Sequence, residues 1–314
     1  MGSGGISVSK SLMFLIILLL YFGCSQHHPT DDTPPVEIDF SRKNPRMPYD
    51  LETDSIAPLH IAIAAMTSPA ENLRYYEELL HYLSQKIQRP VKIEQRKTYK
   101  EVNSLLETRQ IEMAFVCSGA YVEARRHFPI EILAVPQIRG KSTYNAYIIV
   151  HRASSIRRFE DLRGKSFAFT DPLSNTGRLY AVKRVKELGS TPREFFSRII
   201  YTHAHDHSIQ AVARHLVDGA TVDGLIYDYL ETYAPEKVAD LRIIEVSEDF
   251  GMPPIVVPAQ LDPQLKKRLR HIFLHMHEDP AGQKILRQLM IDRFVPAREA
   301  DYKSIEQNLI FVSR

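Results

Sequence analysis

Short apolar runs alternate with amphipathic helical stretches from Leu59 onward, and this alternation limits the possible folds more than any other feature of the sequence. In its first part, strands are expected at residues 59–63, 91–94 and 113–116, with helices around 73–83 and 99–108. This is a β-α-β-α-β order. Strands that alternate with helices predict a mostly parallel sheet with covered faces, where ligands bind beyond the carboxyl ends of the strands.

A second α/β unit follows the first. Strands are expected at residues 147–150, 166–169, 199–201, 224–227 and 255–257, and helices at 155–162, 176–188 and 208–217. Two such units joined by two extended crossings predict a hinged protein with a cleft between two lobes. We expect residues 58–150 and 252–314 in lobe 1 and residues 151–251 in lobe 2. A single large sheet domain is the alternative, because periodicity alone does not separate the two.

The amino terminus carries a targeting signal. Lys10 precedes the apolar run Leu12–Phe22, which has about the length of a signal-peptide hydrophobic region and is too short to span a bilayer comfortably. The run leads to Cys24 in a Leu-Tyr-Phe-Gly-Cys sequence that resembles a lipobox, although Tyr21 stands where Leu is usual. Residues 1–24 are therefore expected to be a lipoprotein signal peptide with its lipidation site. An uncleaved anchor or a non-lipidated signal is the alternative, and each places the rest of the chain outside the cytoplasm.

The next segment, residues 25–57, is polar and proline-rich without strand or helix periodicity, so we expect a flexible tether. Once Cys24 is acylated, only Cys117 remains, and no intrachain disulfide is available. Lys and Arg total 40 against 38 for Asp and Glu, a balance that does not indicate a nucleic-acid partner.

The segment Asp171–Gly177, Asp-Pro-Leu-Ser-Asn-Thr-Gly, follows an expected strand and opens an expected helix. Its hydroxyls and first-turn amides would converge where a helix N-terminus carries partial positive charge. That geometry suits a small anion. An ordinary helix cap would also use Ser-Asn-Thr, so the spacing alone leaves both interpretations open.

Several ordered motifs resemble the phosphate/phosphite/phosphonate-binding (PhnD-like) family of periplasmic proteins. The run Phe167–Gly177 is similar to the signature loop of that family. Further matches follow in order at His205–Asp206 with Ala211–Ala213 and Val217–Gly219, at Val222–Asp228, at Met252–Pro254 and at His277–Gly282. The similarity covers about Leu59 to Asp292 and implies a type II periplasmic-binding fold.

The resemblance also implies a ligand site. Its positions are Ser174, Asn175 and Thr176 in the loop, with Tyr144, His205, Asp206 and Asp228 around the cleft. Asn175 departs from the usual threonine, but an amide can still donate to an oxyanion. An ionised Asp206 or Asp228 only accepts hydrogen bonds, so it favours a ligand that brings a donor: a protonated P–OH, an ammonium group or a neutral acid. Asp228 could instead merely cap a helix that begins at Tyr229.

Cys117 lies at the carboxyl end of an expected strand, where the cleft should be. It is either a small buried hydrophobe or a soft ligand for arsenic(III), because the family resembles arsenite-sensing periplasmic proteins that use a cysteine. His203, His205 and His207 alternate as on one face of a strand, and His271 and His275 lie one helical turn apart. Nothing else supports zinc, so we expect no metal and no cofactor.

The sequence contains no nucleophile elbow, Walker loop, zincin motif or dinucleotide fingerprint, so we expect a binding protein and not an enzyme. The leading interpretation is a lipid-anchored receptor that captures a phosphonate-, phosphite- or phosphate-like oxyanion and delivers it to the permease of an ABC transporter. The alternative is a signalling receptor whose closed form engages a sensor kinase, with arsenite or another oxyanion as the signal.

Overall fold

The computed structural model describes residues 1–2, 57–64, 66 and 69–313. The expected signal peptide, Cys24 and nearly all of the expected tether lie outside the described residues. The fold belongs to one compact unit, Thr53–Arg314. None of the helices in the described part has the length and apolar character that a membrane span requires.

The first lobe is built on a six-stranded sheet with the order β13-β4-β12-β3-β1-β2. Its strands are β1 (Leu59–Ile63), β2 (Val91–Glu94), β3 (Met113–Phe115), β4 (Ile130–Gln137), β12 (Ile255–Pro258) and β13 (Arg293–Val295). β1 pairs in parallel with β2 and β3, whereas β12 and β13 pair antiparallel with their neighbours. A mostly parallel sheet was expected, but the sheet is mixed. The reason is that β12, which comes late in the chain, runs antiparallel to its neighbours β3 and β4.

Both faces of this sheet are covered by helices. They are α2 (Pro69–Ile87), α3 (Tyr99–Glu107), α4 (Ser118–Ala124), α9 (Pro263–Leu274) and α10 (Pro280–Gln288). Along β1, Leu59 and Ile61 belong to the core beneath α2, α9 and α10, whereas Ala62 belongs to the core beneath α3 and α4. This alternation follows from the two-residue period of a strand.

The second lobe is built on a five-stranded sheet with the order β10-β6-β9-β7-β8. Its strands are β6 (Ala146–His151), β7 (Ser166–Phe169), β8 (Arg198–Tyr201), β9 (Gly219–Asp223) and β10 (Leu241–Val246), and its helices are α5 (Tyr180–Glu187), α6 (Pro192–Phe195), α7 (His205–Ala213) and α8 (Gly224–Tyr233). β6 was expected in the first lobe, but it pairs antiparallel with β9 and β10. The chain therefore enters the second sheet just before Ala146.

Two local expectations were wrong. Residues 224–227, expected as a strand, form the start of α8, because β9 ends at Asp223 and the Asp223 side chain caps the helix by accepting from the Leu225 amide at 2.8 Å. Residues 155–162, expected as a helix, contain only the short 3₁₀ turn Phe159–Leu162. Strands β4 and β10 had not been expected from the sequence.

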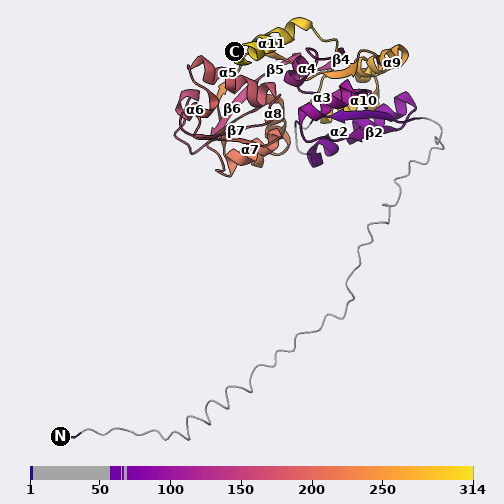
Figure 1. The fold of residues 1–314 in the computed structure, drawn as a ribbon. Coiled ribbons are helices and arrows are strands. Elements are labelled where there is room, and N and C mark those ends of the chain that lie inside the picture. Colours follow the sequence, from indigo (N-terminus) through magenta and orange to yellow (C-terminus); the bar gives the residue numbers. More distant parts are fainter. Residues whose placement is uncertain (3–56, 65, 67–68, 314) are drawn as a thin grey trace, which may run out of the picture. The chain divides into compact units, whose positions relative to one another are not determined.

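The crossings between the lobes include an antiparallel ribbon of β5 (Thr143–Tyr144) and β11 (Phe250–Gly251). Helices α9 and α10 pack on the first lobe, as expected for the returning chain. The last helix, α11 (Lys303–Ser313), instead packs against α4 of the first lobe and α5 of the second (Figure 1). The two lobes are thus joined at the ribbon and along α11.

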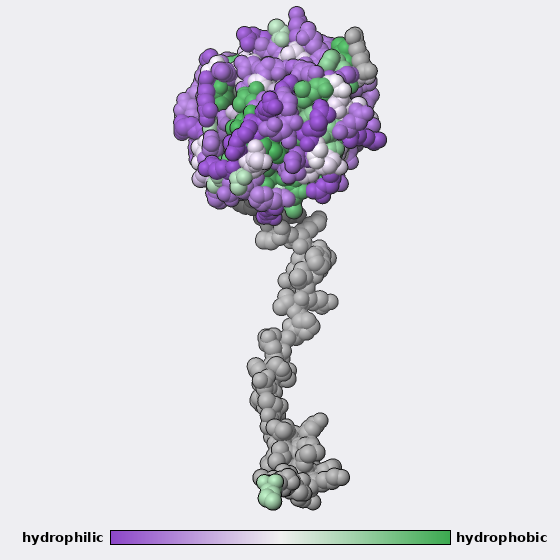
Figure 2. All heavy atoms as spheres, turned by 90° about the vertical axis from the view of Figure 1, so that its left-hand side faces the viewer, coloured by the Kyte–Doolittle hydropathy of each residue, from purple (hydrophilic) through white to green (hydrophobic). Residues whose placement is uncertain are grey.

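The outer surface near α6 is mostly hydrophilic, with hydrophobic residues scattered over it (Figure 2). Exposed large hydrophobic side chains of the second lobe include Tyr201, Leu216 and Val246. Most other large apolar side chains of this lobe, such as Phe159, Phe167 and Phe195, are buried in its core. The polar groups buried between the lobes are therefore the feature that needs a functional explanation.

Candidate ligand-binding site

Two helical segments begin close together where the lobes meet. α4 of the first lobe starts after Cys117, and η2 (Asn175–Leu179), a π-helical turn of the second lobe, starts after Ser174 and continues into α5. A Cβ atom on Gly119 would lie 2.5 Å from the Leu173 carbonyl oxygen and 2.8 Å from the Asn175 nitrogen. The lobes therefore approach each other so closely that only glycine fits at position 119.

The predicted ligand loop lies at this junction. Ser174, Asn175 and Thr176 have no exposed surface. The Ser174 hydroxyl accepts a hydrogen bond from the Gly177 amide at 2.9 Å, so it does cap η2. The Asn175 amide group and the Thr176 hydroxyl find no hydrogen-bond partner among the described residues. Because an unpaired buried polar group costs about 1–3 kcal/mol, a ligand that pairs with these groups would be favoured.

Two tyrosines from the first-lobe side complete the cluster. The Tyr144 hydroxyl lies 2.7 Å from the Ser118 hydroxyl and is buried. Tyr99, at the start of α3, is fully buried, and its hydroxyl has no partner within the described part of the chain. Burial, and secondly the nearby Cys117 sulfur, raise the pKa of both phenols well above the ordinary value. Both side chains are therefore neutral and can donate a hydrogen bond.

The Cys117 side chain is buried beside the ligand loop. It is 1% exposed, as a buried hydrophobe would be. It also lies at the start of α4, where the Asn175 and Gly119 amides partly offset the effect of burial, which raises the thiol pKa. The thiol is therefore protonated at neutral pH and lies next to the ligand loop.

His205 lies beneath the loop at the start of α7. Its Nδ1 accepts from the Asp223 backbone amide at 3.0 Å, and because an amide only donates, the ring proton must be on Nε2. Burial lowers the pKa of His205 to about 3, so the ring is neutral. Nε2 has no partner among the residues described. Asp206 follows in the first turn of α7 and is 5% exposed.

Asp228 is placed less centrally than expected. It lies within α8, which already begins at Gly224, so the alternative that it caps a helix from Tyr229 is wrong. Its two carboxylate oxygens lie 3.3 Å from an Arg139 guanidinium nitrogen and 3.2 Å from the Tyr147 hydroxyl. The acid at the carboxyl end of β9 is Asp223, which is 2% exposed. Burial raises its pKa to about 7, although the amides at the start of α8 oppose the shift.

The histidine patterns do not form metal sites. His205 and His207 lie in α7 and His203 in the turn before it, so the expected alternation along one strand was wrong. His271 in α9 and His275, which follows the end of that helix, contact each other with ring centroids 4.0 Å apart. Among the described residues, no three His, Cys, Asp or Glu side chains are grouped as metal ligands would be.

A family model described as the periplasmic substrate-binding protein of phosphonate ABC transporters matches residues 61–302. The chain belongs to this family. It is 28% identical over 176 residues to the phosphonates-binding periplasmic protein of Escherichia coli (strain K12). That match covers 55% of this chain and 52% of the relative, so the chain spans about half the length of this curated relative.

Solved structures of the same family share the fold. The binding protein of an ABC phosphonate transporter from Pseudomonas aeruginosa superimposes with a TM-score of 0.75 at 24% identity, covering 82% of this chain and 87% of the other. PhnD1 from Prochlorococcus marinus (MIT 9301), in complex with methylphosphonate, gives a TM-score of 0.74 at 16% identity, covering 81% and 98%. The expected two-lobed type II periplasmic-binding fold is therefore confirmed.

Two residues of the polar cluster, Asp223 and Tyr99, were not predicted from the sequence of this phosphonate-binding family member. Asp223 was overlooked because the strand was placed five residues too late, although an acid that ends a strand and caps a helix is a recognisable signal. Tyr99 was treated only as the first residue of a helix. Tyr99 contacts the second lobe, where its backbone amide donates to the Asp171 carboxylate at 3.1 Å. Because the two residues lie 72 positions apart, no local sequence pattern predicts this contact.

The raised pKa of Asp223 predicts a pH dependence of ligand binding. Below about pH 7 the buried carboxyl is protonated and can donate to an oxyanion, whereas above it the carboxylate repels the ligand. Affinity for methylphosphonate should therefore fall as the pH rises from 6 to 8, and Asp223→Asn should weaken this dependence. Isothermal titration calorimetry on both proteins separates this effect from titration of the ligand, which is common to both. Equal slopes in the two proteins would contradict the assignment.

Proposed function

We propose that this protein captures a phosphonate-like oxyanion outside the cytoplasm and delivers it to the permease of an ABC transporter. The observation that carries the proposal is the cluster of buried polar groups without protein partners at the junction of the lobes: the Tyr99 hydroxyl, the Asn175 amide, the Thr176 hydroxyl and Nε2 of His205. All four can donate hydrogen bonds, and a phosphonate supplies several acceptor oxygens.

Electrostatic couplings support a common location for these groups. After burial and the Cys117 sulfur, the Asp223 carboxyl also raises the pKa values of Tyr99 and Tyr144. The Thr176 side chain in turn opposes the larger effect of burial on the pKa of Asp223. The Asn175 side chain acts on the Tyr144 phenol in the same way. The effects of Thr176 on Asp223 and of Asn175 on Tyr144 are hydrogen-bonding effects, which act only at short range, so these four side chains lie close together.

Hydrogen bonds across the lobes support a closed conformation around that volume. The Tyr99 amide of the first lobe donates to Asp171 of the second, and the His205 amide of the second lobe donates to the Met66 carbonyl of the first at 3.0 Å. A ligand that binds the closed form better than the open form shifts the population toward it. A closed, loaded receptor is the form that a permease could distinguish from an empty one.

Calorimetry against a panel of oxyanions tests the proposal. We expect methylphosphonate, phosphite or phosphate to bind with a Kd of about 1 μM or tighter, because about four charge-assisted hydrogen bonds of roughly 1.5–3 kcal/mol each supply the necessary 8 kcal/mol. Binding of arsenite alone, lost in Cys117→Ser, would contradict the proposal and favour the arsenic interpretation of this cysteine.

We also propose that Cys24 is acylated and that the polar segment after it tethers the binding domain to the membrane. Cys24→Ala should release the protein from the membrane fraction but leave ligand affinity unchanged, because a tether of more than 30 residues separates the lipid from the cleft. Fractionation followed by calorimetry checks both parts. Full membrane retention of the variant would show that Cys24 does not carry the anchor.

A further inference from the structure

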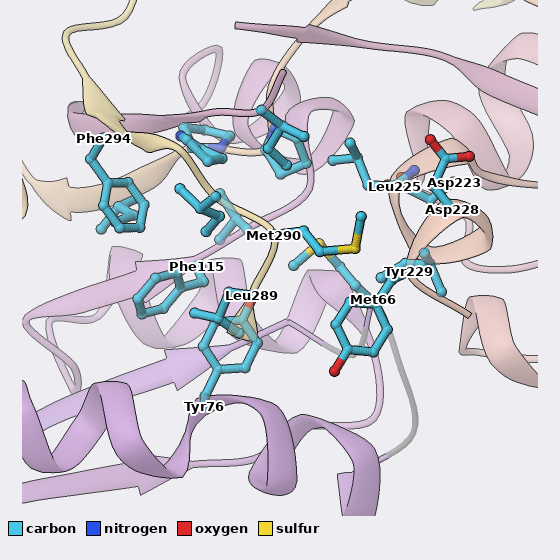
Figure 3. A pocket seen from close by; sticks show the side chains of 18 of the residues that line it. Met66, Tyr76, Phe115, Asp223, Leu225, Asp228, Tyr229, Leu289, Met290 and Phe294 are labelled. Carbon is cyan, nitrogen blue, oxygen red and sulfur yellow. The ribbon is translucent and has the colours of Figure 1, made fainter. Parts of the chain in front are cut away.

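A mostly apolar cavity adjoins the polar cluster at Asp223. It has a volume of about 130 Å³ and is lined by residues of both lobes, among them Met66, Phe115, Leu225, Met290 and Phe294. Figure 3 shows the carboxylates of Asp223 and Asp228 at one end, the rings of Phe115 and Phe294 at the other, and the two methionines between them. An apolar cavity of this size can hold a group as large as a benzene ring.

The cavity and the polar cluster share a wall. Asp223 lines the cavity and also acts electrostatically on Tyr99, Cys117 and Tyr144. Met66 lines the cavity, and its carbonyl accepts from the His205 amide. A ligand whose oxyanion meets the donors of the polar cluster can therefore extend its other end past Asp223 into the cavity.

The charges around the cavity do not favour a cationic group. Among the described residues that line it, the charged side chains are Arg139, Asp223 and Asp228. Both oxygens of Asp228 are already occupied by Arg139 and Tyr147. The Arg139–Asp228 pair is neutral as a whole, so it offers an ammonium group no unpaired carboxylate. Asp223 faces the oxyanion side, where a protonated carboxyl is the more favourable partner.

We infer that this cavity holds the organic substituent of the phosphonate, and that the preferred ligands carry an apolar alkyl or aryl group and not an aminoalkyl group. This inference rests on the proposed function and specifies its substrate class. Each methylene that moves from water into the cavity should increase affinity about fourfold. A phenyl group should therefore improve binding by at least about tenfold over a methyl group.

The test is a calorimetric comparison of phenylphosphonate, butylphosphonate, 2-aminoethylphosphonate and methylphosphonate. We expect the first two to bind at least about tenfold tighter than methylphosphonate and 2-aminoethylphosphonate to bind no tighter than methylphosphonate. Leu289→Trp, which fills the far part of the cavity, should remove the gain while leaving methylphosphonate affinity within about twofold. Leu274→Trp is the matched control, because Leu274 is also a partly buried leucine at a helix end of the first lobe and lies outside the cavity.

The outcomes separate this inference from the proposed function. If methylphosphonate binds but phenylphosphonate and butylphosphonate bind no better, or if 2-aminoethylphosphonate binds best, the inference is wrong and the proposed function stands. If none of the four compounds binds and phosphate and phosphite also fail, both are wrong. If both tryptophan variants lose phenylphosphonate equally, the gain does not come from this cavity and the inference is overturned.

Discussion

Replacing both Ser174 and Thr176 by alanine should weaken phosphonate binding on the order of a hundredfold or more. Both hydroxyls are fully buried at the junction of the lobes, and that of Thr176 has no partner in the described part of the protein. Each hydrogen bond to a charged ligand contributes roughly 1.5–3 kcal/mol, and about 1.4 kcal/mol corresponds to a factor of ten. Calorimetry with methylphosphonate measures the loss directly.

A matched control separates ligand contact from helix capping. Ser174 also caps η2, and losing such a cap costs about 1 kcal/mol of stability. Thr191 caps α6 in the same lobe, on the surface and without a role in the cluster, so Thr191→Ala should cause a similar loss of stability with unchanged affinity. Full affinity in the Ser174→Ala/Thr176→Ala protein would refute the loop as the binding site.

Adding one methyl group at position 119 should prevent full closure and also lower affinity about a hundredfold. The new Cβ of Gly119→Ala would lie 2.5 Å from the Leu173 carbonyl oxygen of the opposite lobe, a distance that real Cβ atoms do not adopt. The lobes would have to stay apart, and donors from one lobe would lose the ligand. Within α4 itself, alanine is more favourable than glycine by about 0.5–1 kcal/mol, so the first lobe should keep its stability.

Gly219→Ala provides the contrasting control. Its Cβ would lie 2.8 Å from the Leu162 side chain within the second lobe, so this variant strains one lobe and leaves the junction unchanged. We expect Gly119→Ala to lose affinity with an unchanged melting temperature, and Gly219→Ala to show the reverse. Scattering profiles with saturating ligand should show a less compact Gly119→Ala protein. A normal affinity in Gly119→Ala would mean that the closed arrangement is not the ligand-bound one.

Most secondary structure in the described part of the chain follows from local sequence. The runs at residues 59–63, 91–94 and 166–169 form strands with the expected bounds, because period-two alternation and β-branched residues are local signals. The loop that contains Ser174, Asn175 and Thr176 also opens a helical segment as expected. Local sequence was ambiguous at Leu225 and Ile226, where two apolar residues after an acid suit a strand or the first turn of a helix.

Pairing and burial were decided by tertiary structure. Whether a strand lies in one sheet or the other depends on partners far along the chain, and β6, placed in the first lobe by sequence position, pairs with β9 and β10 in the second. The resemblance to the phosphonate-binding family identified the fold because several motifs occur in order. It did not identify Asp223, since an offset of a few residues is enough to select a different acid.

The sequence by itself determined the α/β class, the order of the elements and the capped loop that carries the candidate anion donors, because each depends on residues within a few positions of one another. The tertiary structure alone decided how the site is completed. Tyr99 and Asp171 are 72 residues apart and meet across the lobes. The pKa of Asp223 is raised because packing removes it from water, and the apolar cavity exists only where β3, α8 and the segment after α10 converge. Long-range contacts and desolvation are properties of the folded chain, and neither has a local pattern in the sequence.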